Sequence, residues 1–166
     1  MAARHRAREK ALLILYQWDM RRSMSEELAA GAQPGSDFEH DEPEEFGFTV
    51  QQALENYYGS LAIEDDEEKL PEQDVFTEEL VTGVALKSSE VDALITQSAT
   101  NWKIDRMPAV DRNILRIAVY EMQFTGAPPA VAIDEALLLA RRYSGDESAG
   151  FINGVLDSVG KQITKR

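Results

Sequence analysis

The stretch PAVDRNILRIAVYEMQFTGAPPAVAIDEALLLARRY (residues 108–143) contains two helical patterns with a clear break between them. In the first, Asp111 stands at the head of a helix that begins after Pro108, where the helix dipole favours an acidic side chain. Apolar residues recur at helical spacing and predict a buried stripe of Ile114, Leu115, Ala118 and Met122. Gly126 and the pair Pro128-Pro129 end this helix, because glycine favours the position after a helix and proline cannot continue one.

The second pattern, VAIDEALLLARRY (131–143), has acids near its start and two arginines at its end, which complements the helix dipole at both ends. SGDES (144–148) interrupts the pattern, and residues 149–163 predict the last helix. On the N-terminal side, residues 74–102 predict two shorter helices with Ser88 or Ser89 as the N-cap between them. No stretch alternates apolar and polar residues at period two, so the sequence predicts an all-α fold.

Two glycines, Gly83 and Gly154, lie inside these helical patterns, each directly before a valine. Glycine inside a helix is unfavourable by about 0.5–1 kcal/mol relative to alanine. Their presence predicts two places where helices approach each other closely.

The first twenty-two residues predict another helix, which is apolar on two sides. One face carries Ala7, Ala11, Ile14, Leu15 and Trp18, and the far side carries Leu12, Leu13, Tyr16 and Met20. A helix of this kind either lies at the centre of a core or is packed on one side by another molecule.

The charge of the chain is unevenly distributed. The formal net charge is −13, but residues 25–79 alone hold eighteen acids and one base, so the rest of the chain has a net charge of +4. We expect a single domain over residues 1–166 that carries an acidic, flexible insertion at about 31–73, with one helix at roughly 49–60. An acidic tether of this kind could compete with an anionic ligand for a basic site on the same chain, and deleting residues 34–47 would test that hypothesis.

Several chemistries are not expected from this sequence. The chain has no cysteine, which excludes disulfides, thiolate metal sites and cysteine nucleophiles. Its two histidines, His5 and His40, lie in the basic start and the acidic segment, and no phosphate-binding loop or zinc-protease motif is present. No apolar run approaches the roughly 18–20 residues of a membrane span, and the start lacks the pattern of a signal peptide. We therefore expect a non-enzymatic cytoplasmic protein without a catalytic site, a metal or a cofactor.

The stretch MAARHRAREK (1–10) gathers three arginines, a lysine and a histidine against a single acid, Glu9. Arg4 and Arg8 are four residues apart and point the same way on a helix, where like charges repel unless an anion lies between them. RNA phosphates would supply that anion, and Tyr16 could stack on an unpaired base. A solubilising N-terminus explains the same composition equally well, so the arm alone leaves both interpretations open.

Three phrases, VDRNILRIAVYE (110–121), PPAVAIDEALLLA (128–140) and FINGVLD (151–157), resemble the NusB transcription antitermination factors. ARHRAREKALLILYQWD (3–19) is similar to that family's arginine-rich first helix. The resemblance implies about seven helices in two small subdomains and no catalytic activity. It also implies binding to single-stranded boxA RNA of ribosomal-RNA transcripts, together with the small-subunit ribosomal protein NusE. That complex helps RNA polymerase to read through terminators, and some members of the family form homodimers.

The resemblance also assigns roles to individual residues. It implies RNA contacts by the basic arm, the aromatic of the first helix and the loop near residue 147, namely Arg4, His5, Arg6, Arg8, Tyr16, Glu147 and Phe151. It implies contacts with the ribosomal partner for Asp105 and Asp111. Phe151 is alternatively a core residue, and Asp111 alternatively serves as the acid at a helix N-terminus. His5 stands where many relatives have another arginine, so its charge weakens near neutral pH.

Two other functions remain open from the sequence. Some ribosomal-RNA cytosine methyltransferases begin with a domain that resembles NusB, so the chain could be the RNA-recruiting module of such an enzyme, although no glycine-rich cofactor-binding segment follows. The doubly apolar first helix is also compatible with an adaptor that binds only proteins.

Overall fold

The computed structural model describes residues 2–31, 48–64 and 74–165. Within these ranges the chain forms seven α-helices: α1 (Ala2–Gly31), α2 (Val50–Glu64), α3 (Val75–Leu86), α4 (Ser88–Ser98), α5 (Ala109–Tyr120), α6 (Pro129–Tyr143) and α7 (Asp146–Thr164). A 3₁₀ turn, η1 (Ile104–Arg106), precedes α5, and a π-helical turn, η2 (Glu121–Thr125), continues it. No strand occurs among the described residues, and the predicted all-α fold is confirmed.

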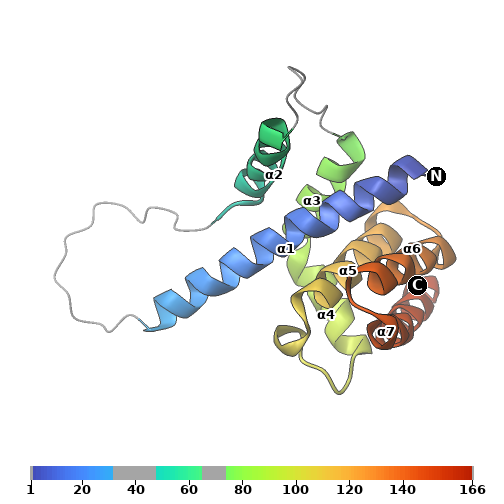
Figure 1. Cartoon of the computed structure of the whole chain (residues 1–166). Helices are drawn as coiled ribbons and strands as arrows, with labels where there is room; N and C mark the ends of the chain where they lie inside the picture. Colours follow the sequence, from blue (N-terminus) through green and yellow to red (C-terminus); the bar gives the residue numbers. More distant parts are fainter. Residues whose placement is uncertain (1, 32–47, 65–73, 166) are drawn as a thin grey trace.

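The helices form two groups that share one core. Helix α1 runs along the molecule; α2 packs against it, α3 crosses behind it, and the compact group α4–α7 lies mostly on one side of it (Figure 1). Helix α5 lies at the centre, where it contacts α1, α3, α4, α6 and α7. The two predicted subdomains are therefore the groups α1–α3 and α4–α7, which α5 joins through a continuous hydrophobic core.

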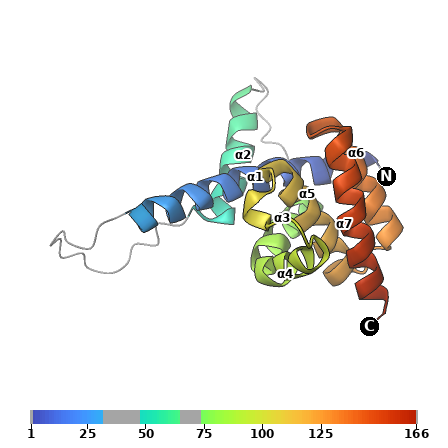
Figure 2. The ribbon, with the colours of Figure 1, turned by 90° about the horizontal axis from the view of Figure 1, so that it is seen from below.

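Helix α1 is longer and more deeply packed than the sequence predicts. It extends to Gly31, and its C-terminal part projects away from the other helices (Figure 2). Leu12, expected on the far side, is only 2% exposed, whereas Leu13, Tyr16 and Met20 are 39–44% exposed. Helix α1 contacts α2, α3 and α5, so its buried arc is wider than a single stripe and includes Leu12. The rest of the second apolar face remains exposed.

Helix α2 confirms the helix that the sequence predicts at roughly 49–60 within the acidic segment. It begins at Val50 and packs on α1 and α3, with Ala53, Leu54 and Tyr58 buried in the common core. These apolar residues recur at helical spacing. The rest of the acidic insertion, residues 32–47 and 65–73, lies outside the described residues. The segment 34–47, whose deletion tests the competition for the basic site, belongs to this part.

Three local predictions have different outcomes. Gly83 does mark a close approach, because a Cβ there would lie 2.1 Å from ring atoms of Tyr120 in α5. Gly154 does not, since its Cβ would meet nothing within 4 Å. The N-cap of α4 is Lys87 rather than Ser88 or Ser89, and no side chain caps this helix, because α3 ends at Leu86 and leaves a single residue between the two helices.

None of the helices in the described part of the chain combines the length and apolar character that a membrane crossing requires. The same residues contain no group of three or more acidic or histidine side chains arranged to hold a metal ion.

Candidate nucleic-acid interface

The N-terminal end of α1 presents two arginines at the surface. Arg4 and Arg6 are both exposed, and the guanidinium carbon of Arg4 lies 5.0 Å from the ring centroid of Phe76 in α3. Stacking on an aromatic ring attracts the cation without neutralising it. Within the described ranges, neither arginine has a carboxylate oxygen within 4.0 Å. The two guanidinium groups are therefore available to an external anion.

Arg8 differs from the expectation that it contacts RNA. Its side chain is 5% exposed and forms a bidentate ion pair with Glu121, with distances of 2.9 Å from Nε to Oε2 and 2.7 Å from Nη2 to Oε1. Burial by itself lowers the pKa of Arg8, but the hydrogen bond and charge of Glu121 outweigh it and raise the pKa. Arg8 does lie on the same side of α1 as Arg4, 5.4 Å from the centroid of Phe76, but the anion that accompanies it comes from the protein itself.

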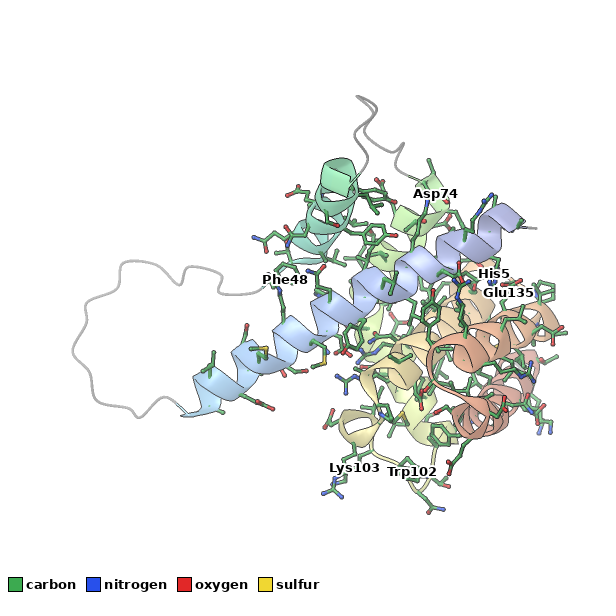
Figure 3. The ribbon with its side chains drawn as sticks, viewed as in Figure 1. His5, Phe48, Asp74, Trp102, Lys103 and Glu135 are labelled. Carbon is green, nitrogen blue, oxygen red and sulfur yellow. The ribbon has the colours of Figure 1, made fainter. Side chains whose placement is uncertain are left out.

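His5 is held between two carboxylates. Its Nδ1 atom lies 2.7 Å from Oε2 of Glu135 in α6, and its Nε2 atom lies 3.6 Å from Oε1 of Glu9 (Figure 3). With 28% of its side chain exposed, His5 faces α6 more than solvent. Its main contact is therefore with the fold, and only one edge of the ring is open to a ligand.

Tyr16 lies further along α1 and is 40% exposed. Leu13 and Met20 flank it on the same exposed face of the helix. The ring is therefore accessible for stacking, as the sequence predicts, but its neighbours are apolar, which suits a protein surface as well as a base.

Glu147 and Phe151 lie in the first turns of α7, where they line a cleft of about 250 Å³. Glu147 is exposed and Phe151 is half-buried. The Phe151 ring packs edge-on against Trp102, with a centroid distance of 5.9 Å and an interplanar angle of 64°. Sequence reasoning missed Trp102, although a tryptophan inside the polar turn NWKIDR (101–106) was a usable signal.

The sequence-predicted RNA residues fall into two separate clusters. Figure 3 shows Trp102, and with it the cleft at Phe151, on the far side of the helical body from His5. Helix α6 contacts the first cluster through Glu135, which lies 2.7 Å from His5, and through Arg142, which forms an ion pair of 2.5 Å with Glu9. The second cluster begins in α7, directly after the turn that follows α6.

Asp111 is buried, which differs from its expected contact with a protein partner. It is 3% exposed and accepts hydrogen bonds from the hydroxyl groups of Ser144, at 2.5 Å, and Ser148, at 2.9 Å. These bonds tie the start of α5 to the turn between α6 and α7. Asp105, in contrast, is exposed on η1 and lines a groove of about 560 Å³ beside the C-terminal part of α1, together with Glu26 and Glu27.

A buried polar network lies below this groove. The Asp19 carboxylate accepts hydrogen bonds from Arg112 and, at 2.9 Å, from Asn113, while Arg116 lies 3.1 Å from it and also pairs with Asp92. Burial by itself raises the pKa of Asp19, but the hydrogen bond from Arg112 and the charge of Arg116 lower it below its usual range. The polar positions of the motif VDRNILR are therefore buried because α5 has helices on all sides.

The all-helical fold and the open arginine pair define a helical binding domain of the kind that contacts nucleic acid or other proteins. A family model described as the NusB family matches residues 5–161. The transcription antitermination protein NusB of Solibacter usitatus is 45% identical over 163 residues, covering 98% of this chain and 92% of that protein. The NusB protein of Streptomyces griseus is 37% identical over 157 residues, covering 94% of this chain and 90% of that protein. The chain belongs to the NusB family.

Solved structures agree with this assignment. A structure of T. maritima NusB has a TM-score of 0.66 at 27% identity, covering 98% of this chain and 97% of that chain. A structure of the antitermination factors NusB and NusE in complex with double-stranded RNA has a TM-score of 0.64 at 25% identity, covering 98% of both chains. The resemblance identified from the sequence phrases is therefore confirmed.

Proposed function

We propose that this protein is a transcription antitermination factor without enzymatic activity. It binds single-stranded boxA-type RNA of ribosomal-RNA transcripts together with the ribosomal protein NusE and promotes read-through by RNA polymerase. The relatives named for antitermination support this function. The solved complex of NusB and NusE with double-stranded RNA supports RNA and NusE as partners. Because transcription takes place in the bacterial cytoplasm, we place the protein there. The observation that carries the RNA contact is the open guanidinium pair of Arg4 and Arg6.

Each residue has a distinct part in the proposed RNA contact. Arg4 and Arg6 bind phosphates, and Phe76 restricts the movement of Arg4. Arg8 positions the end of α1 through Glu121 and does not touch RNA. His5 and Tyr16 contribute at the edge of this contact. Glu147 and Phe151 form a second contact in the first turns of α7.

The experiment is a salt titration of RNA affinity with the Arg4→Ala, Arg6→Ala double variant. Each lost phosphate contact lowers the slope of log K against log salt by roughly 0.7 for a single strand, so we expect a decrease of about 1.4. The control is the Arg21→Ala, Lys87→Ala double variant, which removes the same charge elsewhere on the surface. Equal slopes for the two double variants would overturn the assignment.

We propose that NusE docks at the groove that Asp105 lines. Three arginines also line the groove, but Arg112 and Arg116 are buried and paired with Asp19, and Arg22 is only part-exposed. The exposed carboxylates of Asp105, Glu26 and Glu27 therefore favour a partner with basic side chains. Asp111 enters this contact indirectly, because it holds the start of α5 in place. We expect Asp105→Lys to weaken NusE binding in calorimetry, whereas Asp157→Lys, on the exposed surface of α7, leaves it unchanged.

The exposed stripe of Leu13, Tyr16 and Met20 favours one further candidate, an adaptor that binds only proteins or a second copy of itself. A titration of labelled boxA RNA, with and without NusE, separates the two functions. Absence of RNA binding in both cases would support the adaptor, and sedimentation at several concentrations would detect a homodimer.

A further inference from the structure

The turn between α4 and α5 holds a tryptophan open to solvent. Trp102 is 56% exposed, whereas the second tryptophan of the chain, Trp18, is 7% exposed. The backbone at this turn is fixed by hydrogen bonds from the Trp102 amide to Ala99 and from the Arg106 amide to Lys103, both close to 3 Å. The Phe151 ring supports Trp102 from one side. A large aromatic ring is thus held in a defined place with much of its surface uncovered.

The cleft beside this ring has the size and lining of a site for one planar group. Its walls are Trp102, Phe151, Met107 and Pro108, and its volume is about 250 Å³. Sites for drug-sized molecules begin at about 300 Å³, so this cleft suits a single ring system. Glu147 stands at its rim and offers carboxylate oxygens that can accept a hydrogen bond from an amino group.

Two exposed basic side chains follow Trp102 in the same turn. Lys103 follows Trp102 directly, and Arg106 lies one turn further along η1; both are exposed. In the part of the chain that the structure describes, neither has a carboxylate oxygen within 4.0 Å. Asp105 lies between them, so the turn has a net charge of +1. Open cations beside an aromatic platform are the combination that binds a single-stranded nucleic acid.

We propose that Trp102 is the stacking platform for one unpaired nucleobase of the bound RNA. The base lies in the cleft against the open face of Trp102, while Lys103 and Arg106 hold the flanking phosphates. Glu147 accepts a hydrogen bond from an amino group on the edge of the base, the contact that carboxylates make with cytosine. Phe151 acts mainly as the support that orients Trp102. This inference rests on the proposed RNA-binding function and adds Trp102, as the group that holds the base, to the second contact at Glu147 and Phe151.

The test uses the full-length chain and two readouts. Anisotropy of a fluorescein-labelled boxA-type RNA measures affinity, and tryptophan emission on adding the unlabelled RNA reports stacking. We expect RNA to quench the emission of the wild type and of Trp18→Phe, but not of Trp102→Phe. Trp102→Phe should keep its affinity within a few-fold, because phenylalanine still stacks. Trp102→Ala should bind roughly 5- to 150-fold more weakly with an unchanged salt slope, since only stacking is lost.

A matched control is Leu86→Ala, which truncates another exposed apolar side chain, 79% exposed, at the end of α3. RNAs in which one nucleotide at a time is abasic locate the stacked base. At one position the loss of the base should abolish quenching and also remove the effect of Trp102→Ala.

The outcomes separate this inference from the proposed function. If RNA binds but leaves Trp102 emission unchanged, and Trp102→Ala behaves like Leu86→Ala, the stacking site is wrong while the RNA-binding function stands. If the wild type binds no RNA, the proposed function itself fails. If Trp102→Ala weakens binding of NusE and not of RNA, the turn is a protein contact and the inference is overturned.

Discussion

Replacing Arg8 by alanine distinguishes a residue that binds RNA from one that holds the fold together. The sequence groups Arg8 with Arg4 in a basic arm, but the structure pairs Arg8 with Glu121 across 113 residues of chain. We therefore expect Arg8→Ala to lower the stability of the protein and to leave the salt dependence of RNA binding unchanged.

The magnitude follows from the burial of the pair. The side chains of Arg8 and Glu121 are 5% and 3% exposed, so removing Arg8 leaves a buried carboxylate without its partner. Breaking a buried ion pair from one side costs about 3–5 kcal/mol. In a domain of this size each kcal/mol lowers the melting temperature by about 2–4 °C, so the expected decrease is roughly 6–20 °C. Glu135, 3.6 Å from Arg8, loses a neighbouring charge as well.

Urea and thermal unfolding followed by circular dichroism measure the loss of stability, and a salt titration of RNA affinity measures the phosphate contacts. The double variant Arg8→Met, Glu121→Leu should recover most of the stability, because an apolar pair of similar volume can replace a buried ion pair. If Arg8→Ala changed stability by less than about 1 kcal/mol and decreased the salt slope by about 0.7, as a lost phosphate contact does, the structural role of Arg8 would be refuted.

Three further predictions concern stability. Asp19→Asn should destabilise the fold by about 3–5 kcal/mol near pH 7. The pKa of Asp19 is lower in the folded protein than in the unfolded chain, where it is about 4. The stability that Asp19 contributes is therefore fully present above about pH 4 and is lost as the pH falls through its folded-state pKa. Urea unfolding at decreasing pH should show the stability of wild type approaching that of the variant. Gly83→Ala should destabilise by about 1–3 kcal/mol in thermal unfolding because the Tyr120 ring must move, whereas Gly154→Ala should stabilise by about 0.5–1 kcal/mol. Asp111→Ala should cost about 1–3 kcal/mol and speed hydrogen exchange in the turn between α6 and α7, and unchanged exchange there would contradict its tethering role.

The family and the helical class could both be predicted from the sequence. The phrases around residues 110–121 and 128–140 identify the family, and apolar spacing places most of the helices. The helix at α2 was also predicted, although the surrounding segment is strongly acidic. Spacing alone did not show that the buried arc of α1 extends to Leu12, because α1 has several neighbouring helices. Helical spacing shows which residues share a face of a helix, but it does not show how many of those faces pack against other helices.

The candidate site was predictable only in part. Arg4, Arg6 and Tyr16 are exposed, as expected for side chains of the first helix that are to contact RNA. The burial of Arg8 and Asp111 depends on partners in other helices, namely Glu121 in one case and Ser144 and Ser148 in the other. The same holds for Trp102, which becomes a candidate only because Phe151 packs against it.

By itself, the sequence determined the helices, the family and the position of an arginine-rich end, because these depend on local spacing and short motifs. The tertiary structure decided which of the charged side chains remain open to a ligand. An arginine in a basic arm and one in a buried ion pair look alike along the chain, since the carboxylate that distinguishes them is brought close only by packing. That packing leaves Arg4 and Arg6 at the surface, places Arg8 against Glu121, and creates the cleft at Trp102 from two distant segments.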